Sequence, residues 1–146
     1  MKQNNPEPEY FPFELELEVR DYELDMLGIV NNSVYLNYLE HTRHKFLKSI
    51  DIDFAETSSR GYNLVVTRSE VDFKISLKSG DRFVVRLAMQ RLGKIRFVFY
   101  QQILIQPTMK LALKAKIIGT ALNANGKPCL PPEWEDLFAK LENGDK

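Results

Sequence analysis

The chain has 146 residues, a length that suits one domain and leaves little for a second. Its composition, 44% hydrophobic and 27% charged, is typical of a globular protein with a buried core. Basic and acidic residues both number 20, so the formal net charge is zero. A protein that binds the phosphate backbone of nucleic acid usually has a basic excess, so we do not expect a nucleic-acid partner.

Cysteine and histidine are scarce. Cys129 is the only cysteine, which excludes an intrachain disulfide and favours a reducing compartment. Two histidines and no cysteine pair offer no obvious metal site. The first ten residues have no apolar stretch of the kind found in a secretory signal, and no apolar run reaches the roughly 18 residues of a membrane span. We therefore expect a cytoplasmic protein with no metal site and no membrane span.

Residues 1–9 are polar and contain two prolines, which predicts a flexible tail before a single domain over residues 10–142. Residues 13–19 then alternate between apolar and acidic side chains, a period of two that predicts a half-buried strand. Residues 31–33, Asn-Asn-Ser, are three good helix N-cap residues in succession. They open a helix predicted over residues 33–50, which has apolar side chains on more than one side.

Most of the remaining chain predicts strands. After a loop at Gly61, residues 62–75, 82–90, 95–105 and 109–117 read as strands separated by turns, and Pro132 suits the first position of a short terminal helix. The first of these strands is expected to turn one set of side chains to one face: Val65, Thr67, Ser69, Val71, Phe73 and Ile75. Because one long helix cannot cover both faces of a sheet, we expect an α+β fold in which a curved antiparallel sheet wraps around it. Its edge strands invite pairing with a second copy.

The segment from Arg20 to Arg43 carries the most chemical information. Asp25 stands in a loop before Gly28, and the loop leads into the helix. The first turn of a helix presents unpaired N–H groups and a positive dipole end, which would polarise a carbonyl oxygen and favour an ionised Asp25. Such a carboxylate can hydrolyse a thioester as nucleophile or as general base on water. Taken singly, Asp25 is more typical of an Asx turn and Asn31–Ser33 of a plain helix cap, and it is their clustering at the start of the only long helix that favours a functional site.

The pattern of Asp25, Gly28-Ile29-Val30, Asn32, Tyr35, Tyr38, Glu40 and Arg43 resembles the 4-hydroxybenzoyl-CoA thioesterase-like branch of the hotdog-fold superfamily. The runs RDYELD and GIVNN are most similar to a subgroup that includes plant acyl-lipid thioesterases. The resemblance spans about residues 13–135 in element order. It implies a hotdog fold that assembles as a homodimer or homotetramer, with cofactor-free hydrolysis of acyl-CoA or acyl-ACP at sites between subunits.

The resemblance also implies roles for particular residues. Asp25 matches the catalytic aspartate, and Asn32 matches the residue whose backbone N–H polarises the thioester carbonyl. Gly28 shapes the loop. Tyr35 and Tyr38 are expected to shape the acyl pocket or the helix packing. The family often has aromatic residues where this chain has Asn31 and Asn32.

Charged residues elsewhere have weaker assignments. Glu40 and Arg43 are three residues apart on the helix, so we expect a partly buried ion pair that supports the site rather than catalysis by Glu40. Arg91 and Lys94, in a predicted hairpin, match roughly the place where relatives bind CoA phosphates, although a solvated hairpin explains them equally well.

Two alternatives to an acyl thioesterase stay open at this point. One is a hotdog module that binds acyl-CoA without catalysis. The other is an aryl-CoA thioesterase acting on hydroxybenzoyl or dihydroxynaphthoyl groups.

Overall fold

The structure is a computed structural model and describes residues 7–142. The first six residues of the predicted flexible tail lie outside this range. Within the rest of that tail, the Glu7 carboxylate accepts a hydrogen bond from Gln102 Nε2 at 3.1 Å and lies 3.8 Å from Lys114 Nζ. Among residues 7–142, no helix combines the length and the apolar composition that crossing a membrane requires.

One antiparallel sheet of five strands forms the body of the protein, in the order β1-β3-β4-β5-β2. Its strands are β1 (Phe13–Glu18), β2 (Asn63–Phe73), β3 (Arg82–Leu92), β4 (Arg96–Ile105) and β5 (Lys110–Leu122). All five predicted strands are therefore confirmed, and β1 and β2 are the two edges of the sheet.

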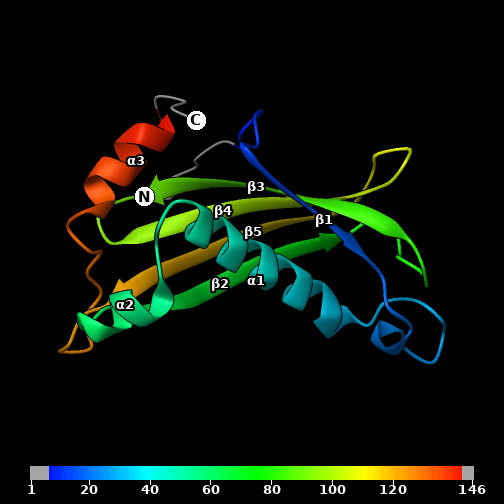
Figure 1. The fold of residues 1–146 in the computed structure, drawn as a ribbon, viewed down its shortest axis with the longest axis horizontal. Coiled ribbons are helices and arrows are strands. Elements are labelled where there is room, and N and C mark those ends of the chain that lie inside the picture. The colour runs from blue at the N-terminus through cyan, green and yellow to red at the C-terminus, as the bar shows by residue number, and fades with distance from the viewer. Residues whose placement is uncertain (1–6, 143–146) are drawn as a thin grey trace.

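A single long helix, α1 (Asn32–Ser49), lies across one face of this sheet (Figure 1). The side chain of Asn31 caps it by accepting a hydrogen bond from the Ser33 N–H at 3.1 Å. Leu39 and Phe46 of α1 pack into a core that includes Phe83 and Phe99 from the sheet. The predicted α+β hotdog architecture, a sheet wrapped around one central helix, is confirmed.

Three smaller features differ from the sequence-based expectation. The predicted loop before Gly61 contains a short helix, α2 (Phe54–Ser59), capped by the Asp53 side chain. A helix of six residues is too short to show a helical period in the sequence, so the sequence did not predict it. A β-bulge between Val66 and Arg68 shifts the register of β2, so Val66 rather than Val65 and Thr67 shares the core face with Ser69 and Val71. The last helix, α3 (Trp134–Glu142), begins two residues after Pro132.

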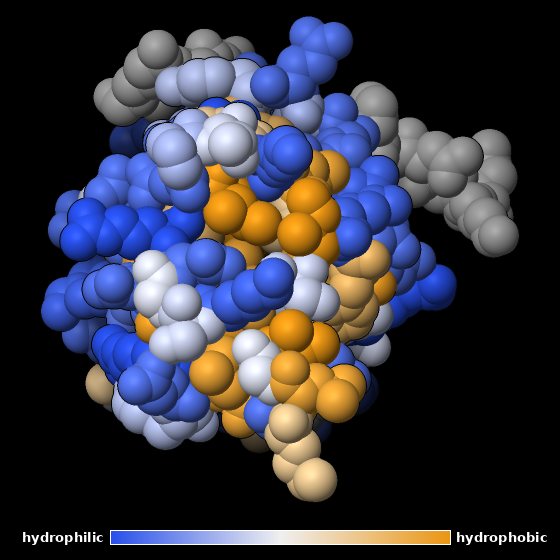
Figure 2. Space-filling view, turned by 90° about the vertical axis from the view of Figure 1, so that its right-hand side faces the viewer, coloured by the Kyte–Doolittle hydropathy of each residue, from blue (hydrophilic) through white to orange (hydrophobic). Residues whose placement is uncertain are grey.

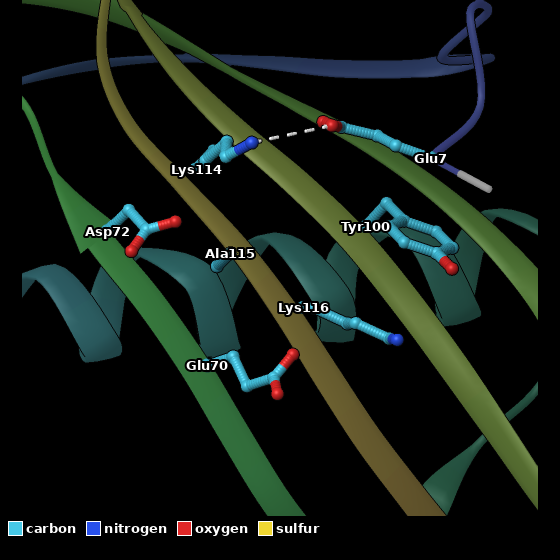
Figure 3. Close-up of a pocket in the computed structure, with 7 residues that line it drawn as sticks. All are labelled: Glu7, Glu70, Asp72, Tyr100, Lys114, Ala115 and Lys116. Carbon is cyan, nitrogen blue, oxygen red and sulfur yellow. Dashed lines mark ion pairs between the residues drawn. The ribbon is translucent and has the colours of Figure 1, made fainter. Parts of the chain in front are cut away.

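The face of the sheet away from α1 is mostly polar. β2 and β5 place acids beside lysines there, with Glu70 paired to Lys116 and Asp72 to Lys114 in the register. Figure 3 shows these side chains and Tyr100 around a shallow pocket of about 240 Å³, with α1 behind the sheet. Cross-strand pairs of opposite charge stabilise a solvated sheet face, so this surface needs no ligand to explain it.

Candidate active site

The segment between β1 and α1 folds back on itself and places Asp25 near the start of α1. The Asp25 N–H donates to the Ile29 carbonyl at 2.8 Å, and the Gly28 N–H donates to the Asp25 carbonyl at 3.1 Å. Gly28 has a φ of 78°, which suits glycine at this tight return. Leu24 and Val30 then face each other in an isolated antiparallel bridge. The turn between them is a small hairpin with Asp25 at its base.

One oxygen of the Asp25 carboxylate holds this turn. Oδ1 accepts from the Leu27 N–H at 2.8 Å and from the Ile29 N–H at 3.4 Å, so the Asx turn considered from the sequence is present. Oδ2 has no hydrogen-bond partner among the described residues. Asp25 is half-buried and lines an open depression together with Asn31, the N-cap of α1. The structural role therefore occupies one oxygen and leaves the other for chemistry.

The start of α1 offers donors beside this carboxylate. No described residue accepts a hydrogen bond from the Asn32 N–H, and the first turn of α1 contains no acidic residue. The unpaired Asn32 N–H and the positive end of the helix dipole thus meet no acidic side chain within the first turn of the helix.

Glu23, which the sequence analysis did not single out, fastens the segment to α1. Its carboxylate Oε1 accepts from the Tyr38 hydroxyl at 2.7 Å and from the Arg20 N–H at 2.7 Å. Its carbonyl accepts from the Asn31 N–H at 3.0 Å. Burial, together with the neighbouring Glu23 carboxylate, raises the pKa of Tyr38 well above its usual value. No local pattern in the sequence pairs Glu23 with Tyr38, fifteen residues away.

Tyr35 fixes the other side of the segment. Its hydroxyl accepts a hydrogen bond from the Leu77 N–H at 2.9 Å, and the Leu77 carbonyl in turn accepts from the Val30 N–H at 2.9 Å. Burial also raises the pKa of Tyr35. Both tyrosines are buried against aromatic neighbours, Tyr35 against Phe73 and Tyr38 against Phe83. In one copy of the chain they therefore act in helix packing and in anchoring the Asp25 segment.

The predicted ion pair between Glu40 and Arg43 is not formed. Arg43 Nη1 instead donates to Gln101 Oε1 at 3.1 Å, and Glu40 Oε1 lies 3.6 Å from His44 Nε2. The Arg43 side chain turns toward the buried sheet residue, whereas the Glu40 side chain stays more than half exposed. Burial lowers the pKa of Arg43, and the charge of Glu40 opposes this shift.

The structure does not bring Arg91 and Lys94 to Asp25 within one copy. The hairpin that holds them joins β3 to β4 at the end of the sheet opposite the Asp25 segment (Figure 1). β3 alone spans about 34 Å at the usual rise per residue. Arg91 Nη1 donates to Glu135 Oε2 of α3 at 2.5 Å, and Lys94 is exposed.

The surface around the Asp25 segment is partly apolar. Figure 2 views this end of the molecule and shows hydrophobic surface gathered in its middle, within a hydrophilic surround. At the tip of the turn, Met26 and Leu27 are 103% and 83% exposed, and both line the depression at Asp25. The depression therefore combines one carboxylate with apolar walls, a combination suited to an apolar chain joined to a reactive carbonyl.

Comparisons with known proteins place the chain in a family. Residues 19–140 match the family model described as the thioesterase-like superfamily. The chloroplastic acyl-acyl carrier protein thioesterase ATL2 of Arabidopsis thaliana is 43% identical over 114 residues, which are 78% of this chain and 60% of that protein. A second protein of this type from Arabidopsis thaliana, ATL3, is 40% identical over 82% of this chain and 63% of its own length. The chain thus spans about three fifths of these two relatives.

Solved structures support the fold. A 1,4-dihydroxy-2-naphthoyl-CoA thioesterase from Synechocystis matches 89% of this chain and 97% of its own with a TM-score of 0.82, at 21% sequence identity. A protein from Aquifex aeolicus matches 87% of this chain and 98% of its own with a TM-score of 0.78, at 27% identity. The matched family model covers most of the chain, and the architecture is that of a hotdog fold. The chain therefore belongs to the thioesterase-like superfamily.

Proposed function

We propose that this protein hydrolyses the thioester of an acyl-CoA or an acyl-acyl carrier protein, with Asp25 as its reactive carboxylate. The observation that carries the proposal is the half-buried Asp25 near the start of α1, where the Asn32 N–H is unpaired, with one carboxylate oxygen unengaged. Family membership supports thioester chemistry, and the names of ATL2 and ATL3 support an acyl group on a carrier protein.

The proposed reaction needs only water and the groups already described. The thioester carbonyl oxygen accepts a hydrogen bond from the Asn32 N–H, which stabilises the negative charge that develops on this oxygen. In one route, Asp25 takes a proton from water as the water oxygen attacks the carbonyl carbon. In the other, Asp25 attacks first, forms a mixed anhydride, and water then hydrolyses it. In both routes the carbon–sulfur bond breaks and the thiol leaves with a proton.

A second copy of the chain completes the proposed site. The outer edge of β2 pairs with no strand among the described residues, and exposed apolar side chains lie along it and on α1, among them Val66, Phe73 and Leu36. Antiparallel pairing of two β2 edges would bring the partner's β3–β4 hairpin to the same end as Asp25. Arg91 and Lys94 can serve as phosphate contacts for CoA or a carrier arm only in such an assembly.

Thiol release from purified protein tests the activity, measured over a panel of aliphatic acyl-CoA, aryl-CoA and acyl-acyl carrier protein substrates. We expect Asp25→Asn to lower kcat at least 1,000-fold, in line with the loss of an essential reactive group. Asparagine can still accept the Leu27 N–H, so the turn and the melting temperature should be retained. Substantial turnover by a folded Asp25→Asn protein would reject the assignment.

The same panel decides between the remaining alternatives. Preference for hydroxybenzoyl or dihydroxynaphthoyl thioesters would make the protein an aryl-CoA thioesterase. Saturable acyl-CoA binding without any thiol release would make it a binding module. The cytoplasmic location stays a prediction from the single cysteine, and the names of both Arabidopsis relatives describe those proteins as chloroplastic.

A further inference from the structure

The end of the sheet that holds the β3–β4 hairpin carries three exposed basic side chains. Lys94 and Arg96 belong to the hairpin, and Lys127 lies in the turn that follows β5. The hairpin and the turn are neighbours because β4 pairs with β5 at this end. Arg96 lies opposite Thr120 in the register, and the Thr120 hydroxyl donates to the Ile95 carbonyl. Two loops that are distant in the sequence thus bring their cations to one end of the sheet, at the left in Figure 1.

None of these three cations forms an ion pair among the described residues. Lys94, Arg96 and Lys127 have no carboxylate within ion-pair distance, and neither loop contains an acidic residue. Ile95, which is 44% exposed, lies between the two hairpin cations and gives the surface an apolar centre. We call Lys94, Ile95, Arg96 and Lys127 the basic end patch. An apolar contact within a charged rim is typical of a surface that binds another protein.

The arginines and acids beside the patch already bind one another. Arg91 donates to Glu135 of α3 at 2.5 Å, and Arg60 forms an ion pair with Glu133 just before α3. Hydrogen bonds from these arginines lower the pKa of both carboxyls, which therefore stay ionised and paired at neutral pH. The two pairs neutralise their own charges and leave the positive charge of the two loops unpaired.

In the proposed assembly the patch lies near a reactive carboxylate. Antiparallel pairing of two β2 edges brings the β3–β4 hairpin of one copy to the end of the other copy at which the partner's Asp25 lies. An acyl carrier protein is a small acidic protein whose acyl group is attached to a flexible phosphopantetheine arm. Opposite charges would steer such a protein to the patch, and the arm would span the distance to the depression.

We propose that the basic end patch docks the acidic surface of an acyl carrier protein while the acyl arm enters the site of the adjoining copy. This docking role rests on the proposed function and selects one form of its substrate. Acyl-CoA has the same arm but no protein surface, so the patch favours the carrier-bound thioester over the CoA thioester. Because the cations are exposed, their attraction acts mainly on association and weakens as ionic strength rises.

Kinetics with one acyl chain in two forms, decanoyl-acyl carrier protein and decanoyl-CoA, tests the patch. We expect Arg96→Glu and Lys127→Glu each to raise the KM for the carrier-bound substrate about threefold, and the double variant to raise it about tenfold or more. The KM for decanoyl-CoA should change less than about twofold, because CoA lacks the docking surface. Lys45→Glu makes the same charge change at an exposed position of α1, so it is the matched control and should alter neither KM.

Two kinetic outcomes would overturn the proposal. An equal rise in KM for both substrates would mean that the cations bind a phosphate of the arm rather than the carrier protein. An unchanged KM for the carrier-bound substrate in the double variant would mean that the patch does not take part in docking.

Direct binding makes the test independent of catalysis. Isothermal titration calorimetry with apo-acyl carrier protein, which lacks the arm, measures docking alone. We expect saturable binding that weakens with added salt and falls at least about fivefold in the double variant. No binding, or undiminished binding in the double variant, would refute the docking role. If charge reversal lowers the melting temperature, the milder pair Arg96→Gln and Lys127→Gln should still weaken binding, by a smaller factor.

The two measurements together separate the docking role from the proposed function. Binding of the apo carrier through the patch without thiol release from any substrate would refute only the proposed function. Thiol release from decanoyl-acyl carrier protein without any dependence on the patch would refute only the docking role.

Discussion

The two halves of α1 differ in which of their groups are left available. At its N-terminal end, the Asn32 N–H has no partner among the described residues, and the surrounding residues Glu23, Asn31 and Tyr38 hold the backbone in position. Farther along, the helix backbone is paired, and what remains open to a cavity is the side chain of Arg43. The two regions therefore suit different kinds of negative charge. The N–H group at the start of the helix suits charge that develops on an oxygen during a reaction, whereas the guanidinium in the middle suits charge that is already present.

Leu39 lies between these two regions, so its removal should affect both. It is 0% exposed and packs in the core under α1. We expect Leu39→Ala to lower the free energy of unfolding by about 2–5 kcal/mol, because it deletes buried methyl groups and leaves a cavity. Lys45→Ala, at an exposed position of the same helix, is the matched control and should cost less than about 0.5 kcal/mol. Urea unfolding measures both, and similar losses would mean that Leu39 does not contribute to the packed core.

A change at Gln101 should act on the middle of the helix. Gln101→Leu removes the acceptor of Arg43 and leaves a half-buried cation without its hydrogen bond. We expect the free energy of unfolding to fall by about 1–3 kcal/mol. A leucine variant with unchanged stability in urea unfolding would show that Gln101 does not hold the cation.

The corresponding change at the N-terminal end is Tyr38→Phe. It removes the hydroxyl that donates to Glu23 and so loosens the segment that carries Asp25. We expect a stability loss of about 1 kcal/mol. Because small misplacements of a reactive group are costly, kcat for thiol release should fall about tenfold while KM changes little. An unchanged kcat in Tyr38→Phe would mean that this hydrogen bond does not position Asp25.

Much of this architecture could be predicted from local patterns. The alternation over residues 13–19 and the caps at Asn31–Ser33 depend only on neighbouring residues, and the structure confirms β1 and α1 nearly to the residue. The position of Asp25 beside the start of α1 follows from the shortness of the loop between them. Local spacing also suggested the pairing of Glu40 with Arg43, which failed because burial turned Arg43 toward the sheet.

Contacts between distant parts of the chain could not be predicted in the same way. Arg43 and Gln101 are 58 residues apart, and their contact depends on the register of three strands, β3, β4 and β5. The bulge after Val66 also has no recognisable pattern in the sequence, although it shifts the register of β2 against β5. The candidate site at the start of α1 could therefore be proposed from the sequence, whereas the contact between Arg43 and Gln101 could not.

The last prediction concerns a loss of stability that is absent at neutral pH and appears only at alkaline pH. Burial raises the pKa of Tyr35 and of Tyr38 above the value of about 10 that an unfolded chain has. Above pH 10 the unfolded chain therefore releases phenolic protons that the folded protein keeps, so the free energy of unfolding must fall as pH rises. The stabilisation is fully present below pH 10 and is lost as pH rises toward the raised values. Urea unfolding at pH 8, 10 and 11 should show this slope, and Tyr38→Phe should make it shallower. An equal slope in Tyr38→Phe would mean that the hydroxyl meets solvent, and the anchor between Glu23 and α1 would not exist in solution.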